Sequence, residues 1–570
     1  MATKLDGVLD ELARADTRAL DTAEALDVLR AILESGHQGE PLIVTGRYGR
    51  VPDPLAELPA LHRHRFLEWP RVFYPGIELV ADAELSTDTD PYLLDHAPYG
   101  LPVFPLVGAI EAMLSAAQCL GRGVGLPVIE DLRIGDAISC SPGQRFVLRT
   151  SALVQPDGSI RASLRCSTTD HAVDHFSARL HWNRAPVARL TLELSEDGVP
   201  AQRVLYSGLV FHGPTFQRVE GYHRIAARGC IARTRAGSQQ RWYGPLQSPL
   251  LAGGDPALRD AVLHALQVCI PQHPVLPVGV TSVEIGCLQA TSEYVISATQ
   301  TASDGREFTF NVDVCNRAGE AIERWTGLRV ARVMSDKGDR SLRRDIDIAL
   351  LEPFVGRLLL DILGESEWQV GVCGGGRQPA SSRMAIRRAL GPQAVLMHRA
   401  DGAPQVAGHQ VSIAHGDDVT LAVAHRRKHI ACDLQALPAG AATDWPLMLG
   451  LQRWGFARDL AASTGLAPDV ACLVVWSASE CLQKLGQRDW PFEVRQASSI
   501  DAPHCGPIVK LQSHDGSVAV GQVRLAGQSV ETAIAVAVTT TPGGPARAAG
   551  GHDPSQQPIP VTFANAGACP

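Results

Sequence analysis

The chain has 570 residues, 45% hydrophobic and 20% charged, which is the composition of a soluble globular protein too long for one core. Its formal net charge of −8 and pI near 6.2 argue against a nucleic-acid-binding protein, which normally carries a basic excess. No apolar stretch approaches the ~18 residues of a membrane span, and 13 cysteines without a C-x-x-C pair fit a reducing compartment. We therefore expect a cytoplasmic protein of several domains.

The first 60 residues predict helices and one short strand, "EPLIVTGRYG", too little material for a domain. Residues 61–335 are mostly alternating strands, interrupted by two apolar helices that begin near residues 106 and 256. Each helix follows a turn and precedes strands, so we predict a duplicated α+β unit in which a sheet wraps around a helix. Segment 336–345 predicts a linker, 346–545 a second α+β domain, and 546–570 a disordered tail.

One histidine stands just before the first apolar helix. His96 precedes Gly100 and Pro105 in "YLLDHAPYGLPVFP", and the helix "LVGAIEAMLSAAQCL" follows at once. That helix is apolar on nearly every side, which predicts burial. The glycine lets backbone approach a substrate closely. His96 is therefore either a hydrogen-bonded core residue or a placed base, and its spacing alone leaves both interpretations open.

The second apolar helix carries a carboxyl group. In "GGDPALRDAVLHALQ", Asp255 followed by Pro256 predicts the helix start. Asp260 and His264 are four residues apart and share one face of the helix. We expect burial to raise the pKa of Asp260 and keep it protonated. A histidine base facing a carboxylic acid suits the elimination of water, and the free N–H groups after Pro105 can hold a carbonyl oxygen.

Four motifs in order resemble the double-hotdog dehydratase domain of polyketide synthases, over roughly residues 60–335. They are the H-x-x-x-G-x-x-x-x-P block at 96–105, the block within "LYSGLVFHGPTFQ", then "DPALRDAVLH" and "LPVGVTSVEI". The resemblance implies that His96 is the base and Asp260 the acid, acting without a cofactor on a β-hydroxyacyl thioester carried by an acyl carrier protein. It also implies substrate-binding positions at Gly100, Pro105, Tyr206, Gly213, Pro214 and His264.

The segment "VLRAILESGHQGEPLIVTGRYG" is similar to the closing helix and strand of a ketoreductase domain. It has no Gly-rich dinucleotide loop and no Ser-Tyr-Lys set, so we expect no reductase activity from it. The whole chain resembles the C-terminal part of an iterative, enediyne-type polyketide synthase, or a subunit derived from one. Ketosynthase and ketoreductase domains are then further partners, and a homodimer is among the assemblies such a chain can form.

A second group of polar residues lies between 346 and 545. "HQVSIAHGDDVTLAVA" and "KHIACDLQAL" predict two strands, the second ending at Asp433, and "VVWSASECLQKLG" predicts the start of a helix. Ser477 and Glu480 then read as a capping box, and Glu480 and Lys484 as an ordinary i, i+4 pair. On the residues alone, this interpretation is purely structural.

The same three blocks, in this order, are similar to the S-x-S-H, G-x-D-x-E and W-x-x-K-E-x-x-x-K motifs of two-lobed phosphopantetheinyl transferases. The resemblance implies Mg²⁺ held by Asp433, by Glu480, which is also catalytic, and by Gln435 in the third acidic position. It implies that coenzyme A phosphates are bound by His415, Lys484, Arg383 and Arg387. This sequence departs from the motifs at Gln435, which is neutral, at Ser479, which replaces a lysine, and at Cys432, which replaces a glycine.

Three functions stay open at this point. The chain is a dehydratase joined to a working transferase, a dehydratase joined to a degenerate domain that docks a carrier protein or dimerises, or a product-template-like cyclisation domain. Cyclising systems usually leave ketones unreduced, so the ketoreductase-like segment and the transferase-like domain favour dehydration. The basic groups around Arg426 and at Arg383, Arg387 and Arg388 are either solvated faces or local sites for an acidic ligand.

Overall fold

The computed structural model describes residues 22–34 and 64–539, apart from gaps at 122–124, 184–188, 193, 195–197, 238–241, 246, 248, 334–342, 438–442 and 488. Of the first 60 residues it describes only helix α2 (Thr22–Glu34). The predicted strand "EPLIVTGRYG", most of the predicted linker and the predicted disordered tail lie outside the described residues. Within the described part of the chain, no helix is long and apolar enough to cross a membrane.

Residues 69–332 build one 13-stranded sheet in which every neighbouring pair is antiparallel. The first half contains β1 (Trp69–Tyr74), β2 (Glu78–Ser86), β3 (Val128–Ile134), β4 (Arg145–Val154), β5 (Ile160–Cys166) and β6 (Phe176–His181). The second half contains β7 (Val199–Pro200), β8 (Val219–Ala226), β9 (Gly229–Thr234), β10 (Val275–Glu284), β11 (Val295–Ser303), β12 (Glu307–Cys315) and β13 (Ala321–Arg332).

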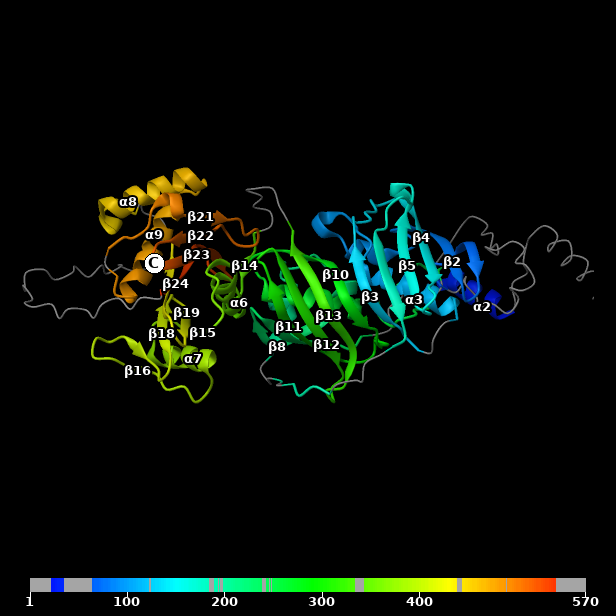
Figure 1. Cartoon of the computed structure of the whole chain (residues 1–570), viewed down its shortest axis with the longest axis horizontal. Coiled ribbons are helices and arrows are strands. Elements are labelled where there is room, and N and C mark those ends of the chain that lie inside the picture. Colours follow the sequence, from blue (N-terminus) through cyan, green and yellow to red (C-terminus); the bar gives the residue numbers. More distant parts are fainter. Residues whose placement is uncertain are drawn as a thin grey trace, which may run out of the picture.

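The two halves repeat one strand order, which confirms the predicted duplication. The first half runs β1-β2-β4-β5-β6-β3, and the second runs β8-β9-β11-β12-β13-β10, with its central helix at the corresponding place in the chain. The antiparallel pairing of β3 with β10 joins the halves into one sheet. Figure 1 shows the two halves side by side along the long axis of the molecule, the first in blue and cyan and the second in green.

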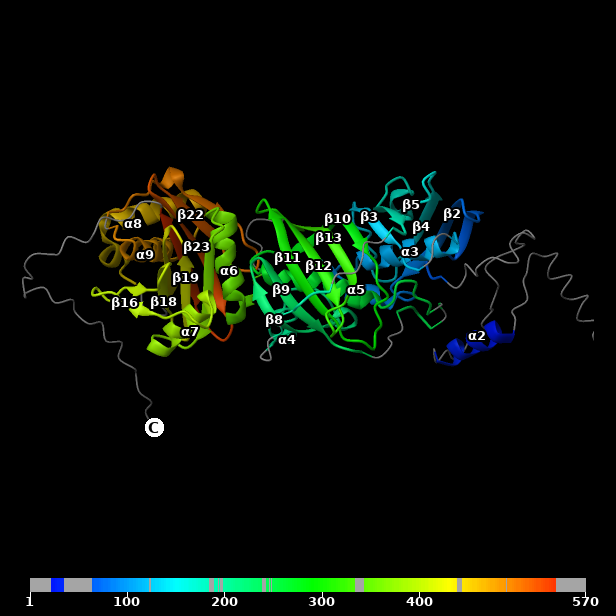
Figure 2. The ribbon, with the colours of Figure 1, turned by 60° about the horizontal axis from the view of Figure 1, so that its bottom comes forward.

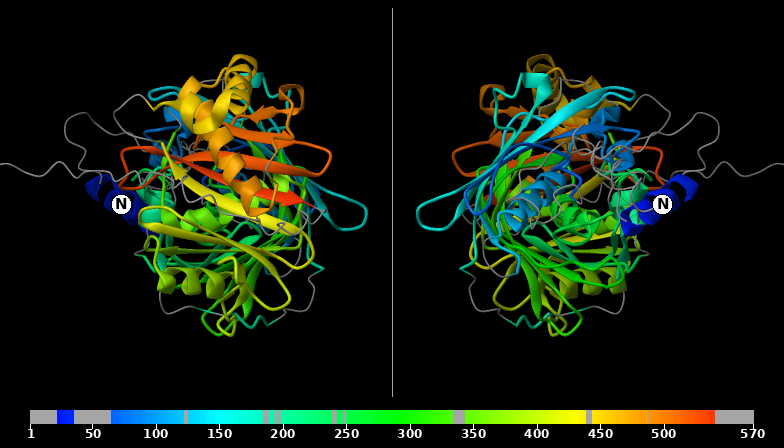
Figure 3. Two further views of the ribbon diagram at one scale, coloured as in Figure 1. Left: turned by 90° about the vertical axis from the view of Figure 1, so that its left-hand side faces the viewer. Right: turned by 90° about the vertical axis from the view of Figure 1, so that its right-hand side faces the viewer.

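Each half wraps its strands around one buried helix. Helix α3 (Leu106–Cys119) is buried at every residue except Gln118, as its all-round apolar sequence predicts. Helix α5 (Pro256–His264) is buried throughout and continues as a 3₁₀ turn, η7 (Ala265–Cys269). The two helices contact each other within the sheet, and the end-on views in Figure 3 show strands curving around helices. This is the architecture expected of a double hotdog.

Short helical elements lie between these strands and helices. They are η3 (Pro91–Asp95), η4 (Pro98–Gly100), η5 (Ser167–Thr169), α4 (Ala201–Val204) and η6 (Pro214–Phe216). Of these, η3 and η6 contact each other. One element of the first half and one of the second therefore meet beside the central helices.

The second domain has two main sheets. In one lobe, β15 (Trp368–Gly374), β19 (Val419–His425) and β18 (Gln410–His415) pack against α7 (Pro379–Leu390), with the hairpin β16 (Met397–His398) and β17 (Pro404–Gln405) beside them. In the other lobe the order is β20 (His429–Ala436), β24 (Glu531–Thr539), β23 (Gly516–Leu525), β22 (Ile508–Gln512) and β21 (Ser498–Ile500). Its helices are α8 (Trp445–Thr464) and α9 (Pro468–Lys484), with a short turn, η11 (Val494–Gln496).

The two domains share one hydrophobic core. Strand β14 (Asp345–Ile346) pairs with β23, and the turn η9 (Ile348–Leu350) leads into α6 (Leu351–Arg357) and a π-helical turn, η10 (Leu358–Ile362). Helix α6 packs on β8 of the first domain and on β15 of the second. Figure 2 shows α6 between the strands of the two domains. Phe354 and Leu358 belong to the same buried cluster as the side chains around α3 and α5.

Candidate functional site

His96 lies in the loop that follows η3, and one hydrogen bond fixes its ring. Its Nδ1 atom is 2.8 Å from the carbonyl oxygen of Val103, and the N–H group of Val103 donates to the carbonyl of His96 at 2.9 Å. Gly100, within this loop, has a φ of +79°, a left-handed conformation that favours glycine. The loop closes on itself just before Pro105, the residue that precedes α3.

Asp260 lies in the middle of α5, where the predicted N-cap holds the start of the helix. The Asp255 side chain accepts a hydrogen bond from the N–H of Ala257 at 2.9 Å. One turn beyond Asp260, His264 places Nδ1 3.0 Å from Asp260 Oδ2, so the predicted shared face is confirmed. The Asp260 side chain is 3% exposed.

A second imidazole reaches the same carboxylate oxygen. His212 Nε2 lies 3.1 Å from Asp260 Oδ2, and the His212 side chain is 7% exposed. Asp260 Oδ1 carries no hydrogen bond recorded among the described residues. Oδ2 is therefore held by two rings, and Oδ1 is the oxygen left to exchange a proton with a ligand.

The fold brings His96 and Asp260 together, although 164 positions separate them. One nitrogen of His96, one of His212 and an oxygen of Asp260 all lie within 4.8 Å of one another. The loops are joined beside them, because Gly213 N–H donates to the Asp95 carbonyl at 2.8 Å. A Cβ atom at Gly213 would lie 2.2 Å from Asp95 Oδ1, so this close approach requires glycine. Pro214 then begins η6, whose Thr215 N–H donates to Asp95 Oδ2 at 2.9 Å.

The protonation of Asp260 differs from the prediction. Burial alone would raise its pKa, but the hydrogen bonds and charges of His212 and His264 hold the pKa of this carboxyl below its ordinary value. The sequence predicts burial correctly, but it misses His212 and the lowering effect of His264, which together reverse the direction. Asp260 is thus a carboxylate in the resting protein.

His96 is held neutral by its surroundings. Burial lowers its pKa to about 4, against an opposing contribution from Asp260, and His212 lowers it further. Its ring makes edge contacts with Phe211 and lies near Phe216, with centroids 5.1 Å and 5.5 Å away. A neutral imidazole has a free lone pair, which is the state that a general base needs.

Tyr206 supports the acid side of the group. Its oxygen accepts the N–H of Val219 at 3.0 Å and lies 3.0 Å from His264 Nε2. The Tyr206 hydroxyl therefore donates to His264 Nε2, and His264 Nδ1–H donates to the carboxylate. Burial raises the pKa of Tyr206 above its ordinary value, so the phenol keeps its proton. Tyr206, His264 and Asp260 form one connected chain of hydrogen bonds.

His212 is the residue of this group to which sequence analysis assigned no role. It lies inside the "FHGPTFQ" block, directly before the glycine that approaches Asp95. The sequence could have identified His212 from this position, because a titratable residue next to a required glycine in a matched motif is a site candidate. Its contact with Asp260 depends on the pairing of η3 with η6, which no local pattern predicts.

The structure also brings together some of the residues predicted to bind Mg²⁺ and coenzyme A in the second domain. Lys484 Nζ donates to the carbonyl of Cys432 at 2.7 Å and to Asp433 Oδ1 at 3.3 Å. Asp433 Oδ2 is buried without a hydrogen-bond partner in the described chain. Burial raises the pKa of Glu480, and the charge of Asp433 raises it further. Gln435 follows Asp433 by two residues on β20 and faces the same side, with its amide donating to Ala436 O at 3.2 Å.

The elements that carry this second group differ from the prediction. Asp433 lies within β20 rather than at its end, and α9 begins at Pro468, so Glu480 stands in the C-terminal half of the helix. Ser477 is fully buried inside α9, which excludes the capping box. The expected register failed because the apolar run before "VVWSASECLQKLG" is itself helical.

The remaining predicted ligands lie in the other lobe. His415, at the end of β18, lies 2.9 Å from the hydroxyl of Ser382 on α7. Burial lowers the pKa of His415, and the charges of Arg377 and Lys484 lower it further, so these cations are its neighbours. Arg383 and Arg387 are exposed on α7. The predicted His415 and Lys484 are therefore neighbours, while nothing in the described contacts ties Arg383 or Arg387 to them.

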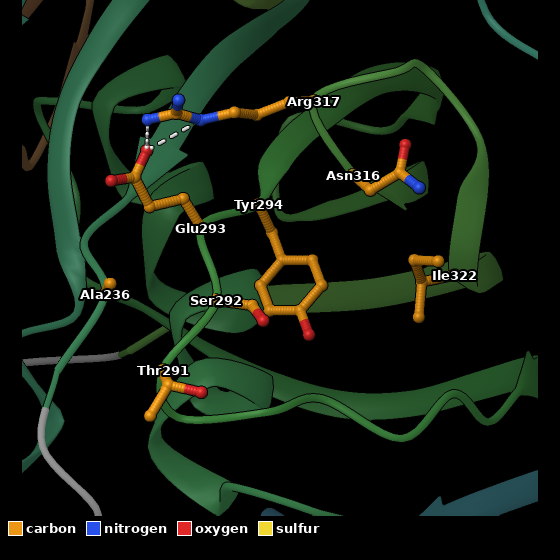
Figure 4. A pocket seen from close by; sticks show the side chains of 8 residues that line it. All are labelled: Ala236, Thr291, Ser292, Glu293, Tyr294, Asn316, Arg317 and Ile322. Atoms are coloured by element: carbon orange, nitrogen blue, oxygen red, sulfur yellow. Dashed lines mark hydrogen bonds and ion pairs between the residues drawn. The ribbon is translucent and has the colours of Figure 1, made fainter.

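A cavity of about 560 Å³ lies elsewhere, where the segment before β11 meets the turn between β12 and β13. Figure 4 shows its rim, where Arg317 pairs with Glu293 and Tyr294 stands at the centre. None of its lining residues belongs to either predicted group. Its polar, open lining holds no cluster of catalytic side chains, so it adds nothing to the chemistry of the site.

Comparison with known proteins gives the following matches. Polyketide synthase GfsB of Streptomyces halstedii is 27% identical over 202 residues, a stretch that covers 33% of this chain and 3% of that protein. The dehydratase domain from the CurF module of curacin polyketide synthase has a TM-score of 0.40 at 18% identity, covering 47% of this chain and 99% of its own. A dehydratase structure concerning the borrelidin and fluvirucin polyketide synthases has a TM-score of 0.40 at 20% identity, covering 48% and 96%.

Two family models match the double-hotdog region. The model described as "Polyketide synthase dehydratase domain" matches residues 74–166, and that described as "Polyketide synthase dehydratase N-terminal domain" matches residues 183–340. The first match contains His96 and the second contains His212 and Asp260. Residues 74–166 and 183–340 of this chain are thus similar to polyketide synthase dehydratase domains.

Proposed function

We propose that the double-hotdog domain removes water from a β-hydroxyacyl thioester carried by an acyl carrier protein. The observation that carries this proposal is the approach of His96 and Asp260, which come from the two halves of the duplicated sheet and meet within 4.8 Å. His96 donates Nδ1–H to Val103, so Nε2 holds the lone pair that takes the proton from Cα. Asp260 Oδ1 is the oxygen that hands a proton to the departing hydroxyl.

The reaction is tested with the full chain and a 3-hydroxyacyl N-acetylcysteamine thioester. We expect the native chain to form the α,β-unsaturated thioester and Asp260→Asn to lose at least about 10²-fold in rate, the usual contribution of a general acid or base. Asp459→Asn, on an exposed residue of α8, is the matched control and keeps the native rate. A native chain that releases no water from any chain length tested, or an Asp260→Asn variant of native rate, contradicts the proposal.

For the second domain we propose Mg²⁺-dependent transfer of phosphopantetheine from coenzyme A to the carrier protein. The supporting observation is the buried, unpartnered Oδ2 of Asp433 beside a second carboxylate, Glu480, whose raised pKa reflects burial and that neighbouring charge. Magnesium prefers oxygen ligands, so this pair fits the ion, with Gln435 as a neutral third candidate. Bound Mg²⁺ would neutralise charge on the phosphates. Lys484 and His415 would orient those phosphates.

The side chain of Ser479 is buried, which changes what a lysine at this position would do. The resemblance places Ser479 where the transferase motif has a lysine, but Ser479 is 3% exposed and donates to Val475 O at 2.7 Å. Its side chain therefore packs inside the helix layer. We expect Ser479→Lys to lower the melting temperature rather than raise a transfer rate, because an ammonium there must be buried or displace neighbours.

Calorimetric titration of coenzyme A, with and without Mg²⁺, tests the transferase proposal. We expect Mg²⁺-dependent heat in the native chain, a gain of phosphopantetheine mass on apo carrier protein, and loss of both in Glu480→Ala. Glu493→Ala, on an exposed glutamate, is the control. Binding that is unchanged by Mg²⁺ and by Glu480→Ala assigns the domain a structural or carrier-docking role instead.

A further inference from the structure

Asp260, the acid of the proposed dehydratase site, carries no proton in the resting protein. Asp260 Oδ2 accepts N–H groups from both His212 and His264, and a carboxylate that accepts two such bonds is the ionised form. Yet the departing hydroxyl must receive a proton before it leaves as water. The proton that His96 removes from the substrate is available in the same centre, on a ring that lies 5.4 Å from His212, centroid to centroid.

The ring of His212 lies beside both the base and the acid. Its Nε2 is bonded to Asp260, while its Nδ1 is buried and has no hydrogen-bond partner in the described chain. A buried, unpartnered nitrogen is costly unless it is used. The ring is also fixed, because it stacks on Phe211 at 4.2 Å and lies 4.4 Å from His264. One nitrogen of His212 lies within 4.8 Å of one nitrogen of His96.

We propose that His212 carries the substrate's α-proton from His96 to Asp260, so that this hydrogen departs in the water. This inference rests on the dehydratase function proposed above. His96 Nε2 takes the proton from Cα, and the electron pair of the C–H bond becomes that of an enolate. The proton passes to His212 Nδ1, and His212 Nε2 releases its proton to Asp260 Oδ2, the oxygen it contacts. Rotation of the carboxyl group about its Cβ–Cγ bond turns this O–H to the position of Oδ1, from which it protonates the hydroxyl and leaves a carboxylate. The C–O bond breaks as the enolate pair forms the Cα=Cβ bond, and no proton enters or leaves.

The relay agrees with the electrostatics of the base. Burial lowers the pKa of His96 to about 4, with a further lowering by His212, so its imidazolium is more acidic than an ordinary one. Such a group gives up a newly acquired proton readily, and His212 is the nearest imidazole that touches the acid. His264 is less suited to this role, because Tyr206 occupies its Nε2 and Asp260 its Nδ1.

The test compares His212→Gln and His212→Phe in the full chain, in D₂O, with a 3-hydroxyacyl N-acetylcysteamine thioester. Glutamine can reproduce the Nε2–H donor to Asp260 but cannot relay a proton, whereas phenylalanine keeps only the ring. We expect both variants to dehydrate at least about 10²-fold more slowly and still to exchange the α-hydrogen of unreacted substrate for deuterium, since His96 is intact. Added imidazole should restore part of the rate. His514→Gln, on a fully exposed side chain, is the control.

Each other outcome is decisive. A His212→Gln variant of native rate shows that the hydrogen bond to Asp260 suffices, and it overturns the relay. The relay is also overturned if a variant with the native melting temperature loses α-hydrogen exchange and dehydration to the same extent. If His212→Phe fails to fold, His212→Gln alone carries the comparison. A native chain that neither dehydrates nor exchanges the thioester overturns the proposed dehydratase function itself, whereas an active native chain with a fully active His212→Gln overturns only the relay.

Discussion

The Nδ1 atom of His96 lies 2.8 Å from the carbonyl oxygen of Val103, and this hydrogen bond decides which nitrogen of the ring is basic. A carbonyl oxygen only accepts, so Nδ1 carries the hydrogen and Nε2 keeps the lone pair. The loop between these residues is closed a second time by the N–H of Val103 on the carbonyl of His96. The base is thus aimed by a short backbone loop, independently of the carboxylate it faces.

This relationship allows the base to be removed without removing its hydrogen bond. Asparagine places an amide N–H near the position of Nδ1, so His96→Asn keeps a donor for Val103 and loses the lone pair. We expect the dehydration rate to fall by about 10²-fold or more with little change in the melting temperature. His514→Asn serves as the control on an exposed histidine. A large drop in melting temperature would instead favour the core-histidine interpretation.

The pH profile should report the depressed pKa of His96. Because the folded pKa is about 4, below the ordinary 6.5, His96 keeps its lone pair through the neutral and weakly acidic range. As pH falls, kcat/KM should stay level through 6.5 and decline only as it approaches about 4, where the base becomes protonated. The profile is measured with the native chain, with circular dichroism checking the fold at each pH. A half-maximal rate near pH 6.5 would contradict the assignment of the base.

Tyr206→Phe tests the hydrogen-bond chain behind the acid. The change removes the donor to His264 Nε2 and leaves the Val219 N–H without its acceptor. A buried unsatisfied group costs about 1–3 kcal/mol, and His264 loses the bond that fixes its orientation. We expect a lower free energy of unfolding together with a roughly tenfold lower rate. Tyr74→Phe, on a 60% exposed tyrosine, is the control. Unchanged stability and rate would show that the chain is not needed.

The sequence predicts what periodicity and local motifs encode. Helix α3, the N-cap at Asp255 and the duplicated order of helix and strands follow from apolar spacing, capping chemistry and repetition along the chain. The site itself depends on long-range contacts. The resemblance paired His96 with Asp260, but the addition of His212 comes from the contact of η3 with η6. The expected rise in the pKa of Asp260 therefore left out His212 and the lowering effect of His264.

Helix boundaries in the second domain were less predictable for a local reason. Apart from Asp469, residues 468–476 are apolar and mix strand-forming with helix-forming types, so the local pattern does not show that α9 has already begun. Asp433 and Lys484 nevertheless contact each other, because β20 packs against α9. The earlier start of α9 does not change which residues the motif places on these two elements. Motif order therefore located the side chains, while the predicted caps and strand end were wrong.

His504 links the two domains and should make stability depend on pH. Its Nδ1 atom lies 3.1 Å from Pro271 O in the first domain, and burial lowers its pKa to about 4. The unfolded chain binds this proton near pH 6.5 and the folded chain does not, so stability is full above 6.5 and is lost as pH falls toward 4. The slope is about 1.4 kcal/mol per pH unit for one such group.

His504→Asn should flatten that dependence, because asparagine keeps a donor for Pro271 and does not titrate. Denaturant unfolding at pH 7 and pH 5 measures the difference for the native chain and the variant. We expect the native chain to lose more stability between these values than His504→Asn does, with His514→Asn behaving as native. Equal losses in all three proteins would place the acid sensitivity elsewhere, for instance at His273, whose pKa burial also lowers.

The buried guanidinium of Arg357 ties α6 to the first domain. It donates to Cys269 O at 2.9 Å, to Ala227 O and to Gln300, lies over the ring of Phe308 at 4.8 Å, and pairs with Asp361 within its own segment. Replacing it leaves Asp361 buried with less compensation, and breaking a buried pair costs about 3–5 kcal/mol.

We expect Arg357→Leu to lower the melting temperature of the whole chain in a single transition, since Phe354 and Leu358 belong to the core that both domains share. Dehydratase inactivation on heating should shift by the same amount, although Arg357 is remote from His96 in sequence and belongs to the other domain. Adding Asp361→Asn should recover part of the loss, because the unpaired charge is then gone. Two separate transitions, with the dehydratase inactivating at its native temperature, would show that the domains fold independently and that the shared core does not couple them.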